Sequence, residues 1–221
     1  MFGGIVGATY SGKLIVNLNN CKVENTIING QSSDILCGHT SEGDQLLIDG
    51  KVCLTDGLLY GSAEKSYYVS KAAGLVYLSK TSIKGNENVV LTADIDLTGI
   101  EFNGLSAFNS ETPNTFDGNN HKISNWTYNG GASDMAFIKG WVGTIKNVSI
   151  ENAHLKTAGR SAVLAGNVYA NIENCHVINS SIEDSYWACG LIAGLYNSGN
   201  VKNCSATNSS VNSGTTFVLT S

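Results

Sequence analysis

The chain has 221 residues, of which 42% are hydrophobic and only 14% charged, and its net charge is −5. No cluster of Lys or Arg is present, which argues against binding to nucleic acid or to an anionic membrane surface. No apolar run approaches the roughly 18 residues of a membrane span, so we expect no membrane insertion in this segment. The 25 Gly and the abundant Asn, against a single Pro, are typical of short strands joined by tight bends.

The first residues, 1–7, carry neither the basic segment nor the cleavage site of a signal peptide. They resemble instead the short, glycine-closed apolar strands that recur later in the chain. We therefore expect the sequence to be part of a longer protein.

One phrase occurs four times, over residues 20–28, 147–155, 174–182 and 203–211. In each copy two Asn lie five residues apart, and the last three copies are 27 and 29 residues apart, a period typical of stacked coils. The alternation of apolar and polar residues breaks at each Asn, which predicts a corner with left-handed backbone. The predicted corners are Asn20, Asn25, Asn147, Asn152, Asn174, Asn179, Asn203 and Asn208.

A further apolar element closed by glycine, such as residues 190–194, recurs between the copies of the phrase. Each coil then has about three short strands, and stacking brings the Asn amides into register as hydrogen-bonded ladders. We predict an all-β fold, a right-handed parallel β-solenoid (β-helix) with about three short strands per coil and one short capping helix.

Two modules are expected along the chain. Residues 1–61 have the pattern of the end of a preceding β-solenoid module, closed by a hairpin or coil at residues 46–54 with Asp49-Gly50 as its turn. Residues 62–221 are predicted to form a second β-solenoid module, which begins with a capping helix at about residues 70–80. Ser70 is the candidate N-cap of this helix.

The six cysteines form no Cys-x-x-Cys pair, which disfavours a zinc site. Cys21, Cys175 and Cys204 occupy the repeat position at which Val148 stands in the remaining copy. Burial as free thiols is therefore favoured over disulfides, although Cys175 and Cys204 could face each other on adjacent coils. We expect no metal and no cofactor.

Two short motifs are candidates for chemistry. Asp94 and Asp96 form an Asp-x-Asp pair that could contribute to a calcium site, but calcium usually recruits more carboxylates. A polar outer face, with Ile95 and Leu97 pointing inward, is the favoured interpretation. Residues 117–121 (Asp-Gly-Asn-Asn-His) have the composition of a metal or catalytic loop, but the tight turn that a solenoid needs here is the favoured interpretation.

The order of several segments resembles that of GLUG-motif repeat proteins, which are adhesin-like surface proteins of Bacteroides-type gut bacteria. The segments are residues 74–78, 91–97, 116–125, 143–148 and 190–194 with 201–204. Trp126 stands where the coil-opening segment usually has Leu, and residues 29–63 match no motif of the family. The resemblance covers most of residues 67–221 and the isolated repeat at residues 3–28. It implies an extracellular β-solenoid attached to the cell surface, and it supplies no catalytic residues.

Aromatic side chains are the best indication of binding, because exposed Trp and Tyr rings can stack on sugars at low entropic cost. The candidate ligand-binding residues are Trp126, Tyr128, Trp141, Tyr186 and Trp187, which belong to a larger group of aromatics that includes Tyr169. The alternative is that these rings fill the core or cover the ends of the solenoid.

We predict a non-enzymatic, adhesin-like repeat module at the cell surface, with an extracellular glycan of host or dietary origin or a host surface protein as its partner. A β-helix polysaccharide lyase or hydrolase and a passive surface stalk are the alternatives. The sequence has no Asp-Asp pair and no Arg-x-Lys element, and Arg160 is the only Arg of the regular coils. A fold shared with such enzymes is not by itself evidence of catalysis.

Overall fold

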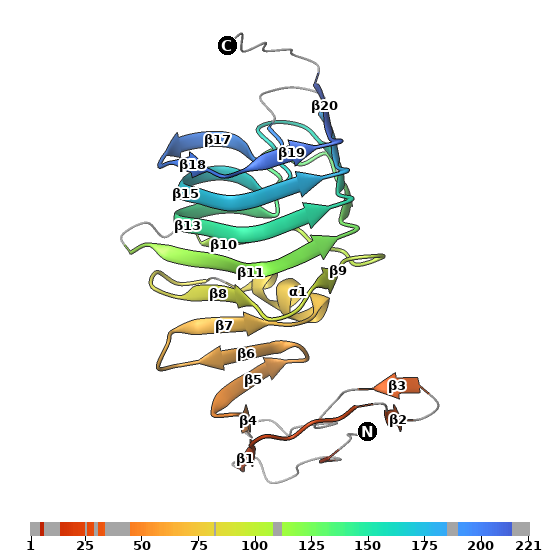
Figure 1. The fold of residues 1–221 in the computed structure, drawn as a ribbon, viewed down its shortest axis with the longest axis vertical. Helices are drawn as coiled ribbons and strands as arrows, with labels where there is room; N and C mark the ends of the chain where they lie inside the picture. Colours follow the sequence, from red (N-terminus) through yellow and green to blue (C-terminus); the bar gives the residue numbers. More distant parts are fainter. Residues whose placement is uncertain are drawn as a thin grey trace.

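The computed structural model describes residues 5–6, 14–24, 26–28, 31–33, 45–81, 83–107, 112–184 and 190–213. These residues are mostly in β-strands, with one short helix, and the parallel strands wind into a β-solenoid of about six turns (Figure 1). The predicted fold class is confirmed.

The parallel stack comprises residues 114–184 and 190–213, in which each coil lies on the preceding one in parallel register. One wall belongs to a fourteen-stranded sheet, and a four-stranded sheet ordered β12-β14-β16-β20 forms another wall. The strands of the stack are β11 (Asn114–Ser124), β12 (Thr127–Asn129), β13 (Ile138–Glu151), β14 (His154–Thr157), β15 (Ala165–Ile178), β16 (Ser181–Asp184), β17 (Ala193–Ser198), β18 (Val201–Lys202), β19 (Ser205–Thr207) and β20 (Ser210–Ser213).

The long strands of the stack bend at asparagine corners. Seven of the eight predicted corners have φ between 50° and 55°, and Asn25 lies outside the described residues. Asn tolerates this left-handed backbone better than other non-glycine residues, because its short side chain can bond locally. These seven corners are Asn20, Asn147, Asn152, Asn174, Asn179, Asn203 and Asn208.

The core lies between the walls, because inward and outward residues alternate along each strand. On β15, Val168 and Ile172 are fully buried, whereas Tyr169 between them is exposed. At the start of the stack the core is aromatic, with ring centroids 5.3–6.3 Å apart in tilted and edge-to-face pairs. The rings are those of Phe102, Phe116, Trp126, Phe137 and Trp141.

The N-terminal part is built differently, as an antiparallel meander of four strands at residues 45–69 (Figure 1). Its first turn is formed by Asp49 and Gly50, both with positive φ (48° and 76°), as the hairpin prediction required. The strands are β4 (Gln45–Ile48), β5 (Lys51–Thr55), β6 (Leu58–Gly61) and β7 (Ser66–Val69). Before them, β1 (Ile15–Leu18) pairs in parallel with β4, and β2 (Thr26–Ile28) with β3 (Gln31–Ser33) forms a separate hairpin.

The meander and the stack share one sheet. The strand β7 pairs in parallel with β8 (Asn88–Leu91), which in turn pairs with β11. Two shorter strands, β9 (Ile95–Asp96) and β10 (Leu105–Ala107), pair with β11 and β13. The strands β6 and β7, which lie on either side of the expected boundary at residue 61, pair with each other, so strand pairing is continuous there. The division into two modules stays a prediction.

The helix α1 (Ala72–Lys80) follows the meander and lies at the level of β8 in Figure 1. Its buried Leu75 and Leu78 belong to the same core as the stack. The N-cap is Lys71, which makes no side-chain cap bond, so the assignment of Ser70 as the cap was wrong. The Ser70 N–H instead donates to the carbonyl of Gly57 at 2.9 Å. Within the described ranges, no helix has the length and apolar character needed to cross a membrane.

Candidate functional site

The tryptophans that were expected to bind a ligand are part of the core. Trp126 and Trp141 are both 0% exposed. Their indole N–H groups donate to the carbonyls of Phe102 and Asn114, each at 3.1 Å, so both rings are buried with their one polar group satisfied. The prediction that they contact a ligand was therefore wrong. Tyr128 is half-buried and packs against the core, while Tyr186 and Trp187 lie outside the described residues.

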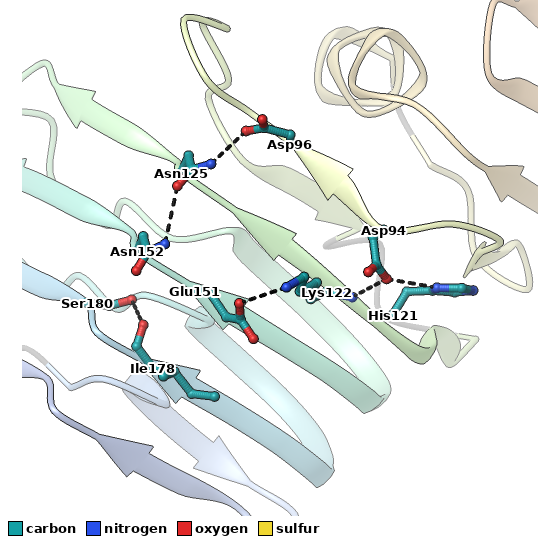
Figure 2. Close-up of polar contacts among 9 residues, drawn as sticks. All are labelled: Asp94, Asp96, His121, Lys122, Asn125, Glu151, Asn152, Ile178 and Ser180. Atoms are coloured by element: carbon teal, nitrogen blue, oxygen red, sulfur yellow. Dashed lines mark hydrogen bonds and ion pairs between the residues drawn. The ribbon is translucent and has the colours of Figure 1, made fainter.

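Asp94 holds two coils together (Figure 2). Its Oδ1 accepts the backbone N–H of Lys122 at 3.2 Å and lies 3.0 Å from Nδ1 of His121, both on the next coil. The hydrogen bond from the Lys122 N–H, followed by that from His121, lowers the pKa of Asp94. Lys122 extends the network by pairing with Glu151 one coil further on, at 3.2 Å.

Asp96, two residues later, has a similar role. Its Oδ1 accepts the hydroxyl and N–H of Thr98, at 2.7 and 2.9 Å, and the side-chain amide of Asn125 at 2.9 Å. The hydrogen bonds from Thr98 and then Asn125 lower its pKa. Ile95 and Leu97 are buried, as the polar-outer-face interpretation requires. No cluster of three or more His, Cys, Asp or Glu able to hold a metal occurs in the described ranges.

Residues 117–121 form a corner of the solenoid. Asn119 and Asn120 have φ of 50° and 63°, and the Asn119 N–H donates to Oδ1 of Asp117 at 2.8 Å. Asp117 pairs with Lys146 of β13, and His121 pairs with Val148. Residues 118–120 therefore make the bend that Asn147 alone makes one coil later. The tight-turn interpretation therefore holds for this loop.

A ladder of side chains connects the equivalent corners of four coils. The Nδ2 of Asn147 donates to Oδ1 of Asp117 at 3.1 Å. In the same direction Asn174 donates to Asn147, and Asn203 to Asn174, each at 3.1 Å. Every amide thus donates toward the preceding coil and offers its oxygen to the following one. We call this row of four residues the corner ladder.

The corner ladder begins on a carboxylate, which can only accept. Partial burial alone would raise the pKa of Asp117, but hydrogen bonds from Asn119 and Asn147 and the Lys146 ammonium, 3.2 Å away, bring the pKa below its ordinary value. The second row of corners repeats the pattern, because Asp96 accepts from Asn125, which accepts from Asn152 at 3.3 Å (Figure 2). Both rows therefore start from an aspartate.

Serine satisfies backbone groups at the inner side of the second corner. The Ser180 hydroxyl accepts the N–H of Ala153 at 3.0 Å. It donates to the carbonyl of Ile178 at 2.9 Å (Figure 2). Ser209 repeats this one coil later, accepting from the Ser180 N–H at 3.0 Å. These bonds supply partners for backbone groups that the corner removes from the strand ladder.

Cysteines of the repeat phrase are free thiols, as expected. Cys175 is a buried free thiol, and Cys21 and Cys204 are free thiols that are only partly buried, while Cys37 and Cys189 lie outside the described residues. Burial raises the pKa of the Cys175 thiol to about 12, so it is not a reactive nucleophile at neutral pH.

The outward side of β15 presents an exposed aromatic ring between amides, which we call the Tyr169 patch. Tyr169 is 46% exposed, and Asn167 and Asn171 face the same side of the strand. Asn167 Oδ1 accepts from Asn197 Nδ2 at 2.6 Å, and Asn171 Oδ1 accepts the Asn200 N–H at 3.0 Å. These bonds to the next coil fix the amides beside the ring. The signal was available in the sequence, since apolar residues alternate with Tyr169 along β15.

A depression of about 420 Å³ lies between α1 and residues 99–103. Its lining holds one cation, Lys80, and one carboxylate, Glu101. Glycoside hydrolysis normally uses two carboxylates that flank the bond to be cleaved. The depression therefore lacks the arrangement expected of a hydrolase.

No family model matches the chain. Over 114 residues, 48% of this chain, the sequence is 31% identical to halomucin of Haloquadratum walsbyi (strain DSM 16790 / HBSQ001). A solved structure from Bacteroides ovatus, named "putative immunoglobulin A1 protease", aligns with 70% of this chain and 79% of its own, at 17% identity and a TM-score of 0.25. That score does not show a shared fold. The chain spans about 1% of the length of the halomucin that it matches.

Proposed function

We propose that this chain is a non-enzymatic, adhesin-like module of an extracellular β-solenoid protein and that it binds a neutral glycan at the Tyr169 patch. The observation that carries the proposal is the exposed Tyr169 ring, which lies between two asparagines on the outward side of β15. The resemblance to GLUG-motif surface proteins supports the extracellular, surface-attached location. The partial match to halomucin is compatible with it.

The chemistry of the patch suits a sugar without charge. A tyrosine ring offers a rigid apolar face for the C–H groups of a pyranose, at low entropic cost. Amides supply both donors and acceptors, as sugar hydroxyls require, and Asn167 and Asn171 are already held in place by the following coil.

A binding role is favoured over catalysis by the positions of the acidic side chains. Asp94, Asp96 and Asp117 each accept hydrogen bonds from the next coil and thereby join coils. Carboxylates that act on a glycosidic bond must instead converge on one substrate.

The test is titration of the chain against immobilised neutral oligosaccharides, comparing wild type with Tyr169→Ala. Loss of the stacking ring should weaken binding about three- to tenfold. Tyr77→Ala is the matched control, because Tyr77 is also exposed (38%) but lies on α1, far from β15 in the sequence. It should leave the affinity unchanged.

Two results would contradict the proposal. Equal weakening by Tyr77→Ala and Tyr169→Ala would show that the patch is not specific. Absence of binding to every glycan tested would favour a passive stalk, a role that the continuous sheet from β1 to β17 also suits.

A further inference from the structure

The depression between α1 and residues 99–103 has walls of opposite charge, and the function proposed above does not use it. Its volume of about 420 Å³ lies within the range of roughly 300–1,000 Å³ that small-molecule sites occupy. Lys80, in the last turn of α1, lines one wall, and Glu101 lines the other. Because α1 lies at the level of β8 in Figure 1, this surface is at neither end of the solenoid.

Both walls of the depression are anchored in the core. On α1, Leu75 and Leu78 are fully buried. On the opposite wall Phe102 is buried, and its carbonyl accepts the indole N–H of Trp126 at 3.1 Å. The two walls are therefore fixed before a ligand arrives, so binding requires little further ordering of the protein.

Lys80 is available to a ligand because other side chains serve the end of its helix. The hydroxyls of Ser79 and Thr81 donate to carbonyls of the last turn, at 2.8 and 3.3 Å. The described part of the chain places no carboxylate within ion-pair distance of the Lys80 ammonium. The positive charge in the last turn thus remains free to pair with an anion.

Glu101 supplies the opposite charge on the other wall. Its Oε1 accepts from Nδ2 of Asn103 at 3.4 Å, a contact within its own loop. Across the residues that the structure describes, no cation pairs with Glu101, so it and Lys80 are too far apart to neutralise each other. Two separate charges of opposite sign are complementary to a ligand that carries both signs.

The remaining lining favours an apolar group over a sugar ring. Ala73, Val76 and Ile100 contribute apolar surface, and Ile100 is 38% exposed, so a ligand that covers it removes apolar area from water. The eight described residues of the lining include no aromatic ring on which a sugar could stack. The site therefore differs in chemistry from the Tyr169 patch.

We propose that the depression binds a short zwitterionic peptide, with its carboxylate at Lys80, its ammonium at Glu101 and an apolar side chain against Ile100. In an extended dipeptide the charged ends are up to about 7 Å apart, which suits two protein charges that do not reach each other. A free amino acid carries both charges on one carbon and spans less. A dipeptide also has a size that a depression of this volume accommodates.

The test is titration of the ¹⁵N-labelled chain with the dipeptide alanyl-leucine, followed by NMR. We expect saturable shifts of the amide signals of residues 73–80 and 99–103. Lys80→Met should weaken binding about two- to fivefold, because it removes one exposed ion pair. Lys84→Met is the matched control, since Lys84 is also exposed but does not line the depression, and it should leave the affinity unchanged.

Blocked peptides assign each charge to its partner. Lys80→Met should not weaken binding of the C-terminally amidated peptide, which has no carboxylate to lose, whereas Glu101→Gln still should. The N-acetylated peptide should show the reverse pattern, because it lacks the ammonium that pairs with Glu101. A merely structural effect of either replacement would weaken all three peptides equally.

Several outcomes would overturn the proposal. These are the absence of saturable shifts in the two segments, equal weakening by Lys80→Met and Lys84→Met, or an equal effect of Lys80→Met on the free and amidated peptides. Equal shifts with a neutral disaccharide would identify a sugar as the occupant instead. Because Lys80, Lys84 and Glu101 are exposed, their replacement should preserve the fold, which the dispersion of the NMR spectrum checks.

Discussion

The parallel stack and the antiparallel meander solve the same problem of pairing strands in different ways. In the stack, partners are 27–30 residues apart and equivalent positions recur, so one type of side-chain bond is repeated from coil to coil. In the meander, partners such as Tyr60 and Tyr67 are close in sequence, and each pair has its own chemistry. Repetition allows ladders, whereas a meander needs individual contacts.

A tyrosine pair illustrates the individual contacts of the meander. The rings of Tyr60 and Tyr67 have centroids 4.8 Å apart, and both hydroxyls donate to the carboxylate of Glu87, at 3.4 and 3.0 Å. Burial, and then the hydrogen bond to Glu87, raises the pKa of Tyr67. Tyr67 therefore stays protonated as a donor throughout the neutral range. No equivalent pair recurs in the part of the chain that the structure describes.

The largest expected effect is a loss of stability, and it should differ between the two regions because their aromatic side chains are buried to different extents. Trp141→Ala should lower the free energy of unfolding by about 3–5 kcal/mol, since it empties a fully buried site and leaves the Asn114 carbonyl without its donor. Tyr67→Ala in the meander should cost less, because Tyr67 is only half-buried. Urea denaturation measures both. An equal or larger loss at Tyr67 would show that the meander, and not the stack, dominates stability.

The next effect compares two positions of one column in the stack. Ile172→Ala should cost about 2–5 kcal/mol, because coils cover it on both sides. Val201→Ala should cost clearly less, since half of its surface is already exposed. The same denaturation experiment measures the difference, and comparable losses would mean that Val201 is covered in solution.

Corner residues allow backbone strain and the ladder bond to be separated. Asn174→Gly keeps the left-handed backbone and loses the amide, which should cost about 0.5–1.5 kcal/mol, while Asn174→Ala should cost roughly 1–2 kcal/mol more. In the meander, Gly50→Ala adds strain alone, because φ is 76° and a Cβ there meets nothing within 4 Å. The loss of unfolding free energy caused by Gly50→Ala should therefore be similar to the difference between the losses caused by Asn174→Ala and Asn174→Gly. A much larger difference at Asn174 would contradict this separation.

The smallest expected effect is the pH dependence of the corner ladder. The folded pKa of Asp117 is lowered, so its contribution is present above the unfolded value of about 3.9 and is lost as the pH falls through the folded pKa. Asp117→Asn keeps an acceptor for Asn147 but removes the titration. The stability of wild type should therefore fall more steeply than that of the variant between roughly pH 5 and pH 2. Parallel curves would exclude this role for Asp117.

Periodicity in the sequence was sufficient to predict the stack. The offsets of the two Asn in each copy place Asn147 and Asn152 at corners, and the apolar residues between them point inward. These features are local, because a corner needs only a residue that accepts positive φ and a strand needs only alternation. The same reasoning placed the turn at Asp49 correctly.

Features that depend on contacts between distant residues were not predictable. The indole N–H of Trp126 finds its acceptor on Phe102, 24 residues earlier, so nothing near Trp126 in the sequence indicates burial. Asp117 is the first residue of the corner ladder. Its corner has three residues, whereas the corner of the next coil has Asn147 alone, so the sequence does not reveal that the two corners are equivalent. The Tyr169 patch requires residues of two coils, and only the register brings Asn197 beside Asn167.

The strands of the stack run across the long axis of the molecule, so the hydrogen bonds between coils point along it (Figure 1). Tension applied between the two ends should therefore act on one coil at a time and break the hydrogen bonds of that coil before those of the next. Successive corners are 27 and 29 residues apart, so each opened coil releases roughly 90–105 Å of chain. We therefore expect the stack to lengthen under tension in steps of one coil.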